Sequence, residues 1–120
     1  YTAQTESLAA LEQFVQIGDE GQKIQFVCFK VEIPEKVKIE KIDIGSLPAN
    51  WKDTPSPDAL KAYGAEWLAQ GQSAVLKAPS ALISSDCNFI LNPLHPDFQK
   101  IKISAPEEFC YDPRMWKEQT

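Results

Sequence analysis

Among the acidic residues of this chain, Glu12 has the sequence surroundings that best suit a catalytic carboxylate. It follows Leu8 by four positions and precedes Val15 by three, so in a helix it lies beside a stripe of apolar residues. A carboxylate at the edge of an apolar surface is partly desolvated, which makes it a candidate for catalysis. The same position suits a glutamate at the rim of a core with a hydrogen-bonded partner, and the pattern favours that structural interpretation.

Ser80 is a second candidate, in the run Pro79-Ser80-Ala81 directly after a predicted strand. A serine at the end of a strand can project its hydroxyl into a cleft, or it can start a turn. The sequence has no Gly-x-Ser-x-Gly pattern of the kind that carries hydrolase nucleophiles. Spacing alone therefore favours the turn.

His95 is the single histidine, and it lies between two prolines in the loop Asn92-Pro93-Leu94-His95-Pro96. A lone histidine suggests acid–base catalysis. The prolines instead predict a stiff loop whose polar groups hold its shape, and we expect Asn88 and Asn92 to help hold it. The structural role is the favoured one.

Several classes of site are excluded by what the sequence lacks. Three cysteines lie far apart with no Cys-x-x-Cys pair, and one histidine completes no common zinc site, so we expect no metal. The five glycines form no phosphate-binding loop. A net charge of -5 without a basic face argues against direct nucleic-acid binding, and no apolar run is long enough to span a membrane. Unpaired cysteines, with Cys28 expected to be a buried thiol, favour a reducing, cytoplasmic location.

The elements that must position these residues are short and mixed in type. Apolar periodicity and capping residues predict helices over 5–17, with Thr5 as cap, and from Ser56-Pro57 to Gly71, with the Ser56 hydroxyl as cap. Residues 19–22 are expected to be a loop. Strands are predicted over 23–33, 36–44, 73–78, 87–91, 101–104 and 109–111. The first two strands are close enough in sequence to pair, and the lysines of the second suggest a solvated edge. The order of predicted helices and strands indicates an α+β fold with largely antiparallel strands.

Several segments, taken in order, resemble the RES domain family. They begin with Tyr1-Thr2-Ala3 and continue through Ser7–Glu12, Leu47–Trp51, Gly64–Leu68, Ala78–Ala81 and Asn88–Phe98 to Phe109–Arg114. Each fragment is weak alone, but their shared order covers nearly the whole chain. RES proteins are typically toxins of toxin–antitoxin pairs, and their fold is similar to that of ADP-ribosyltransferases.

The resemblance implies an activity and a set of site residues. Characterised members break NAD at the nicotinamide–ribose bond, so NAD is expected as substrate, with no separate cofactor. Tyr1 matches the family's tyrosine, expected to bind NAD, while Glu12 and Ser80 match its catalytic glutamate and serine. Candidate partners are an Xre-type antitoxin protein and a second copy of the chain.

The upstream part of the family pattern is not matched. RES domains also use an arginine upstream of the tyrosine, and this chain starts at Tyr1, whereas Arg114 matches a C-terminal motif instead. We therefore expect residues 1–120 to form one RES-like domain that lacks its N-terminal segment, and that is inactive without it. Three hypotheses stay open: an NAD glycohydrolase or phosphorylase, an ADP-ribosyltransferase that modifies a protein, and a non-catalytic binding module with the same fold.

Overall fold

The computed structural model describes residues 1–116 and has the α+β architecture that the sequence predicts. Its strands are β1 (Thr2–Ala3), β2 (Phe26–Cys28), β3 (Val31–Glu32), β4 (Ile39–Lys41), β5 (Val75–Pro79), β6 (Cys87–Leu91), β7 (Lys102–Ile103) and β8 (Glu107–Phe109). Its α-helices are α1 (Glu6–Ile17) and α2 (Asp58–Gln70), and its 3-10 helices are η1 (Gly18–Lys23), η2 (Ile44–Ser46), η3 (Pro96–Lys100) and η4 (Pro113–Met115).

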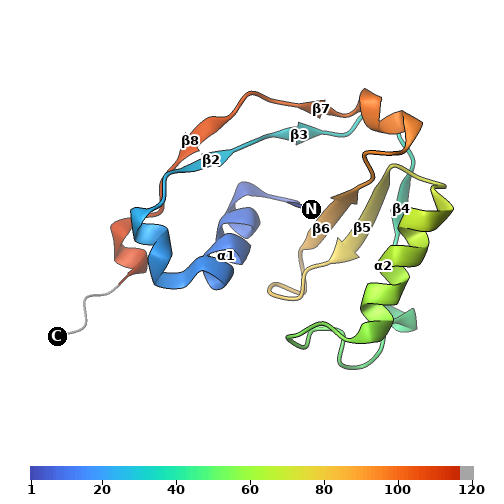
Figure 1. Ribbon diagram of the computed structural model, residues 1–120, viewed down its shortest axis with the longest axis horizontal. Helices are drawn as coiled ribbons and strands as arrows, with labels where there is room; N and C mark the ends of the chain where they lie inside the picture. Colours follow the sequence, from blue (N-terminus) through green and yellow to red (C-terminus); the bar gives the residue numbers. More distant parts are fainter. Residues whose placement is uncertain (117–120) are drawn as a thin grey trace.

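A four-stranded sheet in the order β1-β6-β5-β4 forms the centre of the fold (Figure 1). β6 pairs antiparallel with both β1 and β5, and only β4 runs parallel to its neighbour β5. The sheet is therefore largely antiparallel, as predicted. β4 is an edge strand, and the lysines before and within it, Lys36, Lys38 and Lys41, are exposed, which confirms the solvated edge.

Both faces of the sheet are covered, because successive side chains of a strand point to opposite sides. Val75 of β5 packs on one face with Val37 and Ile101, and Leu76 packs on the other with Ile42 and Trp67. The two strand residues are fully buried. β5 therefore forms the middle of the core.

Helix α2 covers the Leu76 face of the sheet. Its Trp67 is buried, and the indole Nε1 donates a hydrogen bond of 2.9 Å to Ser73 Oγ. The helix ends at Gly71, whose φ of 59° lies in the left-handed region, as predicted. The predicted Ser56 cap is wrong: Pro57 is the cap residue, and no side chain caps this helix.

Two short two-stranded ribbons, β2 with β8 and β3 with β7, form an arm along one side of the molecule (Figure 1). The strands predicted over 23–33 and 36–44 are close enough in sequence to pair, but in the structure they pair with other segments. Apolar patterns identify strands but not their partners. Within the arm Cys28 is half-buried, not fully buried as expected.

Helix α1 begins and ends where the sequence predicts. Thr5 Oγ1 accepts a hydrogen bond of 3.1 Å from the Leu8 amide, and Gly18, with φ of 61°, ends the helix. Only Leu8 of the apolar stripe is buried, whereas Val15 is 64% exposed. Residues 19–22 belong to η1 and are not the open loop that was predicted.

An aromatic cluster holds α1 against the arm and the C-terminal segment. The Tyr111 ring contacts the rings of Phe14, Phe26, Phe109 and Trp116. The Tyr111 hydroxyl donates to the carbonyl of Ala10 in the middle of α1. These contacts fix the position of the helix that carries Glu12.

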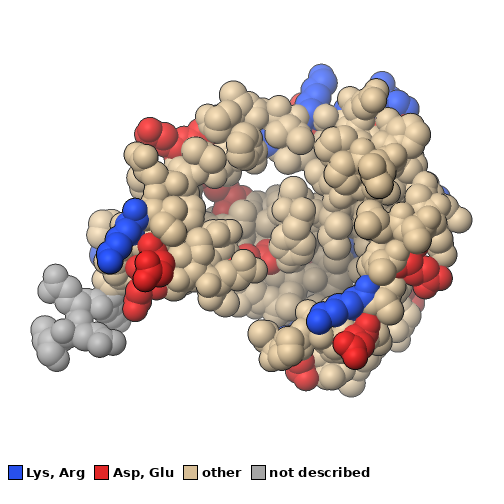
Figure 2. All heavy atoms as spheres, viewed as in Figure 1, with Lys and Arg blue, Asp and Glu red and all other residues tan. Residues whose placement is uncertain are grey.

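The molecule is open in shape. Figure 2 shows an opening between the arm and the rest of the chain. The radius of gyration is 16.2 Å, compared with the roughly 14 Å of a compact domain of this length. Within residues 1–116, neither helix has the length and apolar character needed to cross a membrane.

Candidate active site

Glu12 lies on the face of α1 that turns toward the sheet. It follows the buried Leu8 by four residues, so both side chains leave the helix on the same side. Glu12 is half-buried, and each of its carboxylate oxygens accepts a hydrogen bond from a different segment of the chain.

Tyr1 supplies the first of these bonds. It precedes β1, whose pairing with Asn88 and Phe89 of β6 brings the start of the chain to the edge of the sheet. From there the Tyr1 hydroxyl donates to Glu12 Oε2 at 2.7 Å, while most of the ring stays exposed. Partial burial, this hydrogen bond and the charge of Glu12 all raise the pKa of Tyr1 above its usual range, so the phenol stays a proton donor.

Asn88 supplies the second bond, and sequence reasoning missed it. Its amide Nδ2 donates to Glu12 Oε1 at 2.6 Å and to the Thr2 carbonyl at 3.3 Å. The prediction that Asn88 holds the proline loop is wrong, because its side chain leaves β6 on the face that meets α1. An asparagine within a predicted strand, where this residue type is disfavoured, was the available signal.

Ser80 lies near this group, but its hydroxyl takes part in a turn. It follows β5, whose Ala78 pairs with Asn88. The Ser80 side chain is fully buried, and its Oγ accepts bonds of 3.2 Å from the amides of Leu82 and Ile83. In this conformation the hydroxyl closes a turn, and its expected role toward NAD stays a prediction.

The proline loop is held by its own polar groups. Asn92 Oδ1 accepts from the Leu94 amide at 3.1 Å, and His95 Nδ1 accepts from the Asp97 amide at 3.0 Å. The ring nitrogen thus caps η3. A structural role for Asn92 and His95 is what the flanking prolines predicted.

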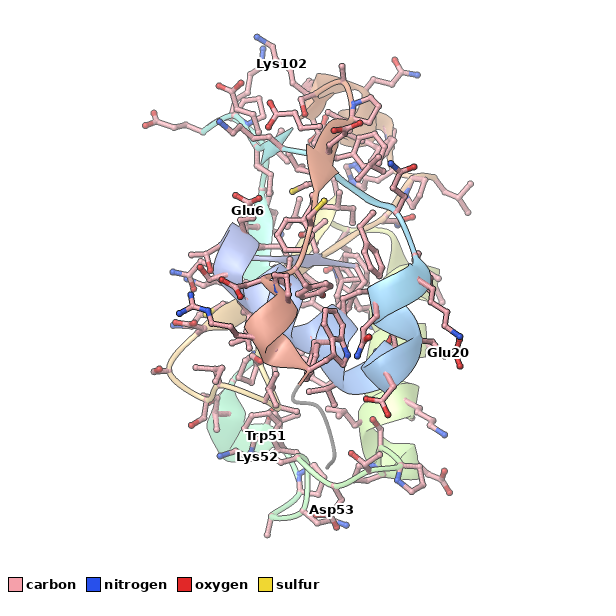
Figure 3. The ribbon with its side chains drawn as sticks, turned by 90° about the vertical axis from the view of Figure 1, so that its left-hand side faces the viewer. Glu6, Glu20, Trp51, Lys52, Asp53 and Lys102 are labelled. Atoms are coloured by element: carbon pink, nitrogen blue, oxygen red, sulfur yellow. The ribbon has the colours of Figure 1, made fainter. Side chains whose placement is uncertain are left out.

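Two cavities adjoin the site, and Tyr1 lines both. The smaller, here called the aromatic cavity, has a volume of about 200 Å³, and Asn88 lies in its wall. The rest of its lining is mostly apolar: Ile42, Leu47, Trp51, Ser56, Leu60, Tyr63, Gly64, Leu76, Ala78, Pro79, Ala81 and Ile90. Trp51 comes from the loop that precedes α2, and the Lys52 ammonium lies 5.3 Å from the centre of its ring (Figure 3).

The second, here called the large cavity, has a volume of about 810 Å³ and lies between α1, β1 and the arm. Its charged lining residues are Glu6, Lys30 and Glu107. Neither cavity includes Glu12 or Ser80 in its lining, whereas Tyr1 and Asn88, the two residues bonded to Glu12, line the aromatic cavity. Among residues 1–116 there is no group of three or more histidine, cysteine, aspartate or glutamate side chains that could hold a metal ion.

A sequence model of the RES domain matches residues 1–112. The chain belongs to the RES domain family. It is 37% identical over 116 residues to "Toxin Res" of Yersinia enterocolitica, covering 96% of this chain and 76% of that protein. "Toxin Res" of Photorhabdus laumondii is 35% identical over 118 residues (98% and 75%), and "Prs ADP-ribosylating toxin" of a Sphingobium species is 31% identical over 117 residues (96% and 73%).

The RES segments noted in the sequence lie around one place in the fold. The second of them ends in Glu12 on α1, and the segment from Asn88 to Phe98 contains most of β6 and the first residues of η3. The C-terminal segment from Phe109 to Arg114 contains Tyr111, the residue that anchors α1. The RES domain thus brings Tyr1, Glu12 and Asn88 together from parts of the chain that lie far apart in sequence.

Proposed function

We propose that this RES domain acts as an NAD-degrading toxin that cleaves the bond between nicotinamide and ribose. One observation carries the proposal: the Glu12 carboxylate is held by donors from Tyr1 and Asn88, both of which line a small, mostly apolar cavity that also contains the rings of Trp51 and Tyr63. A fixed anion beside a pocket for a flat aromatic ring is the arrangement that this reaction needs.

The chemistry requires little proton transfer. When the bond between the pyridinium nitrogen and ribose C1′ breaks, the electron pair stays on nitrogen and nicotinamide leaves as a neutral molecule. The ribose is left as an oxocarbenium-like cation. A carboxylate preorganised beside it stabilises the charge that develops in the transition state, which is the role proposed for Glu12.

The two cavities suit the two ends of NAD. In this proposal the nicotinamide ring enters the aromatic cavity, where Tyr1 stacks on the cationic ring. The remainder of the dinucleotide extends into the large cavity, which Tyr1 also lines. Ser80 contributes a hydroxyl to the ribose or amide only if its turn opens.

The acceptor distinguishes the candidate reactions. Attack by water at C1′ gives ADP-ribose and a proton, and attack by phosphate gives a phosphorylated ADP-ribose. Attack by a protein side chain gives an ADP-ribosylated protein, and the name of the Sphingobium relative, "Prs ADP-ribosylating toxin", favours this as the second candidate. All three begin with the same bond cleavage.

A non-catalytic binding module is the rival function. The charged residues that line the large cavity are two acids and one lysine, a poor set for the diphosphate of NAD. Binding of NAD without turnover by the full-length protein would support this rival. The name "Toxin Res" of two relatives supports the toxin role. The toxin proposal also includes an Xre-type antitoxin or a second copy of the chain as partner, and the cytoplasm as the place of action.

The test is nicotinamide release from NAD by the purified full-length protein. We expect Glu12→Gln to lower the rate by about 100-fold or more. Glutamine keeps the shape of glutamate and can still bond to Tyr1 and Asn88, so the charge is what the substitution removes. Glu20→Gln is the matched control, because Glu20 is exposed on η1 at the outer edge of the molecule (Figure 3). An active Glu12→Gln protein would contradict the proposal.

A further inference from the structure

Asn88 is a buried polar residue that the proposed reaction does not yet use. It is 2% exposed and lies in β6, an inner strand with neighbours on both sides. A side-chain amide is disfavoured in such a place unless its hydrogen-bonding groups are satisfied. Its contacts therefore indicate why the fold keeps it there.

The orientation of the Asn88 amide is fixed by chemistry. An ionised carboxylate only accepts hydrogen bonds, so Glu12 must face the NH₂ group and not the carbonyl oxygen. The same Nδ2 also donates to the Thr2 carbonyl of β1. Asn88 thereby links three elements: its own strand β6, the strand β1 and the helix α1, which carries the carboxylate.

The two donors to Glu12 differ in how firmly they are held. Tyr1 is 75% exposed and precedes a two-residue strand, whereas Asn88 is buried within the sheet. Of the two bonds, the one from Asn88 therefore sets the position of the carboxylate relative to the sheet and the aromatic cavity.

We propose that Asn88 is the positioning residue of Glu12, holding its carboxylate in one orientation beside the cavity wall that contains Asn88 itself, through the Nδ2–Oε1 hydrogen bond. This inference rests on the proposed NAD cleavage. It predicts that loss of the bond lowers kcat, because the carboxylate is then misplaced in the transition state, and leaves KM nearly unchanged.

Asn92 offers a matched comparison in the loop that directly follows β6. It is as buried as Asn88, at 2% exposed, but its Oδ1 accepts a hydrogen bond from the nearby Leu94 amide. Substitutions of Asn92 thus report what losing a buried asparagine does to the fold without touching Glu12.

The sharpest variant is Asn88→Asp, which exchanges the donor for an acceptor at unchanged size. At neutral pH two carboxylates then face each other across a hydrogen-bond distance, and the bond is lost. As the pH falls from about 8 to about 5, the pair takes up one proton, because like charges this close raise the pKa of one partner. The protonated carboxyl group that the substitution introduces then donates to Glu12 and restores the bond.

The experiment measures kcat and KM for nicotinamide release by the full-length protein against pH. For Asn88→Asp we expect kcat at neutral pH to be reduced on the order of 10- to 100-fold. The ratio of the variant's kcat to the wild-type kcat should rise as the pH falls. Asn88→Ala should lose kcat to a similar extent with a ratio independent of pH. Asn92→Asp should show no rise at low pH.

The outcomes separate this inference from the proposed function. A ratio for Asn88→Asp that stays flat with pH, or an effect on KM alone, overturns the role of Asn88 while the loss of activity in Glu12→Gln still supports NAD cleavage. If Asn88→Asp does not fold, wild-type kcat in Asn88→Ala overturns it equally. If wild-type protein releases no nicotinamide, the proposed function fails and this inference fails with it.

Discussion

The Tyr1 hydroxyl is a hydrogen-bond donor over the whole neutral pH range. Desolvation raises its pKa above the ordinary 10.0, and the bond to Glu12 and the charge of Glu12 raise it further. The pKa of Tyr1 is higher in the folded state than in the unfolded state. The protonated hydroxyl therefore stabilises the folded state fully below a pH of about 10, and this stabilisation is lost as the pH rises through the folded-state pKa. We expect Glu12→Gln to lower the pKa of Tyr1 by part of the shift, because burial remains.

The ionisation of Tyr1 can be followed by the ultraviolet absorbance of phenolate. The chain has three tyrosines, so subtracting the titration of Tyr1→Phe from that of the parent protein isolates this residue. Glu20→Gln serves as the control for losing one surface charge, and circular dichroism checks that the protein is still folded. A Tyr1 titration that is the same with and without the Glu12 carboxylate would contradict the hydrogen bond.

At the residue scale, the sequence predicts the site in part. The spacing of Leu8 and Glu12 fixes which face of α1 carries the carboxylate, because the geometry of a helix is local. The contact between Glu12 and Asn88 joins residues 76 positions apart and depends on how α1 packs against β6. No local pattern encodes that packing, so Asn88 was assigned to the wrong neighbour.

At the scale of elements, Gly64 within α2 and Gly71 at its C-terminal end have opposite expected effects. Gly71→Ala should lower the free energy of unfolding by about 1 kcal/mol, because its φ of 59° is a left-handed conformation that costs a residue with a Cβ. Gly64→Ala should raise it by up to about 1 kcal/mol, because alanine is the better helix former. At both positions a Cβ meets no heavy atom within 4 Å, so neither effect comes from a clash.

Denaturant unfolding of the two variants checks this pair of predictions. Gly71→Asn is the control, since asparagine adopts the left-handed conformation more readily than alanine and should cost less. Two changes of the same sign would show that helix geometry does not govern α2. Gly64 also lines the aromatic cavity, so its alanine variant should bind NAD less well even though it is more stable.

The helices were easier to predict than the strand partners. Thr5, Gly18 and Gly71 mark helix ends through contacts within a few residues. Strand 87–91 was also predicted with its observed bounds, since its apolar run is sharply delimited. The pairings of β4 with β5, of β2 with β8 and of β3 with β7 join segments tens of residues apart. Pairing over such distances is decided by the assembled core and not by the pattern of either strand.

At the scale of the whole molecule, stability is concentrated in the central sheet. β5 is buried on both faces, whereas the arm consists of isolated two-stranded ribbons whose Val27 and Phe29 are 57% and 51% exposed. Ribbons of two strands are only marginally stable alone. The opening beside the arm follows from this uneven distribution of the core.

Amide hydrogen exchange should reveal the same order. We expect the amides of β5 and β6 to exchange slowest, through global unfolding, and those of β2, β3, β7 and β8 to exchange about 100-fold faster or more through local opening. Mass spectrometry of peptides from the two regions measures both rates in one sample. Equal protection of the amides in the two regions, measured in dilute protein, would contradict the marginal stability of the arm. Protection of the arm that increases with protein concentration would instead mean that a second copy covers its exposed Val27 and Phe29, because association stabilises the surface that it buries.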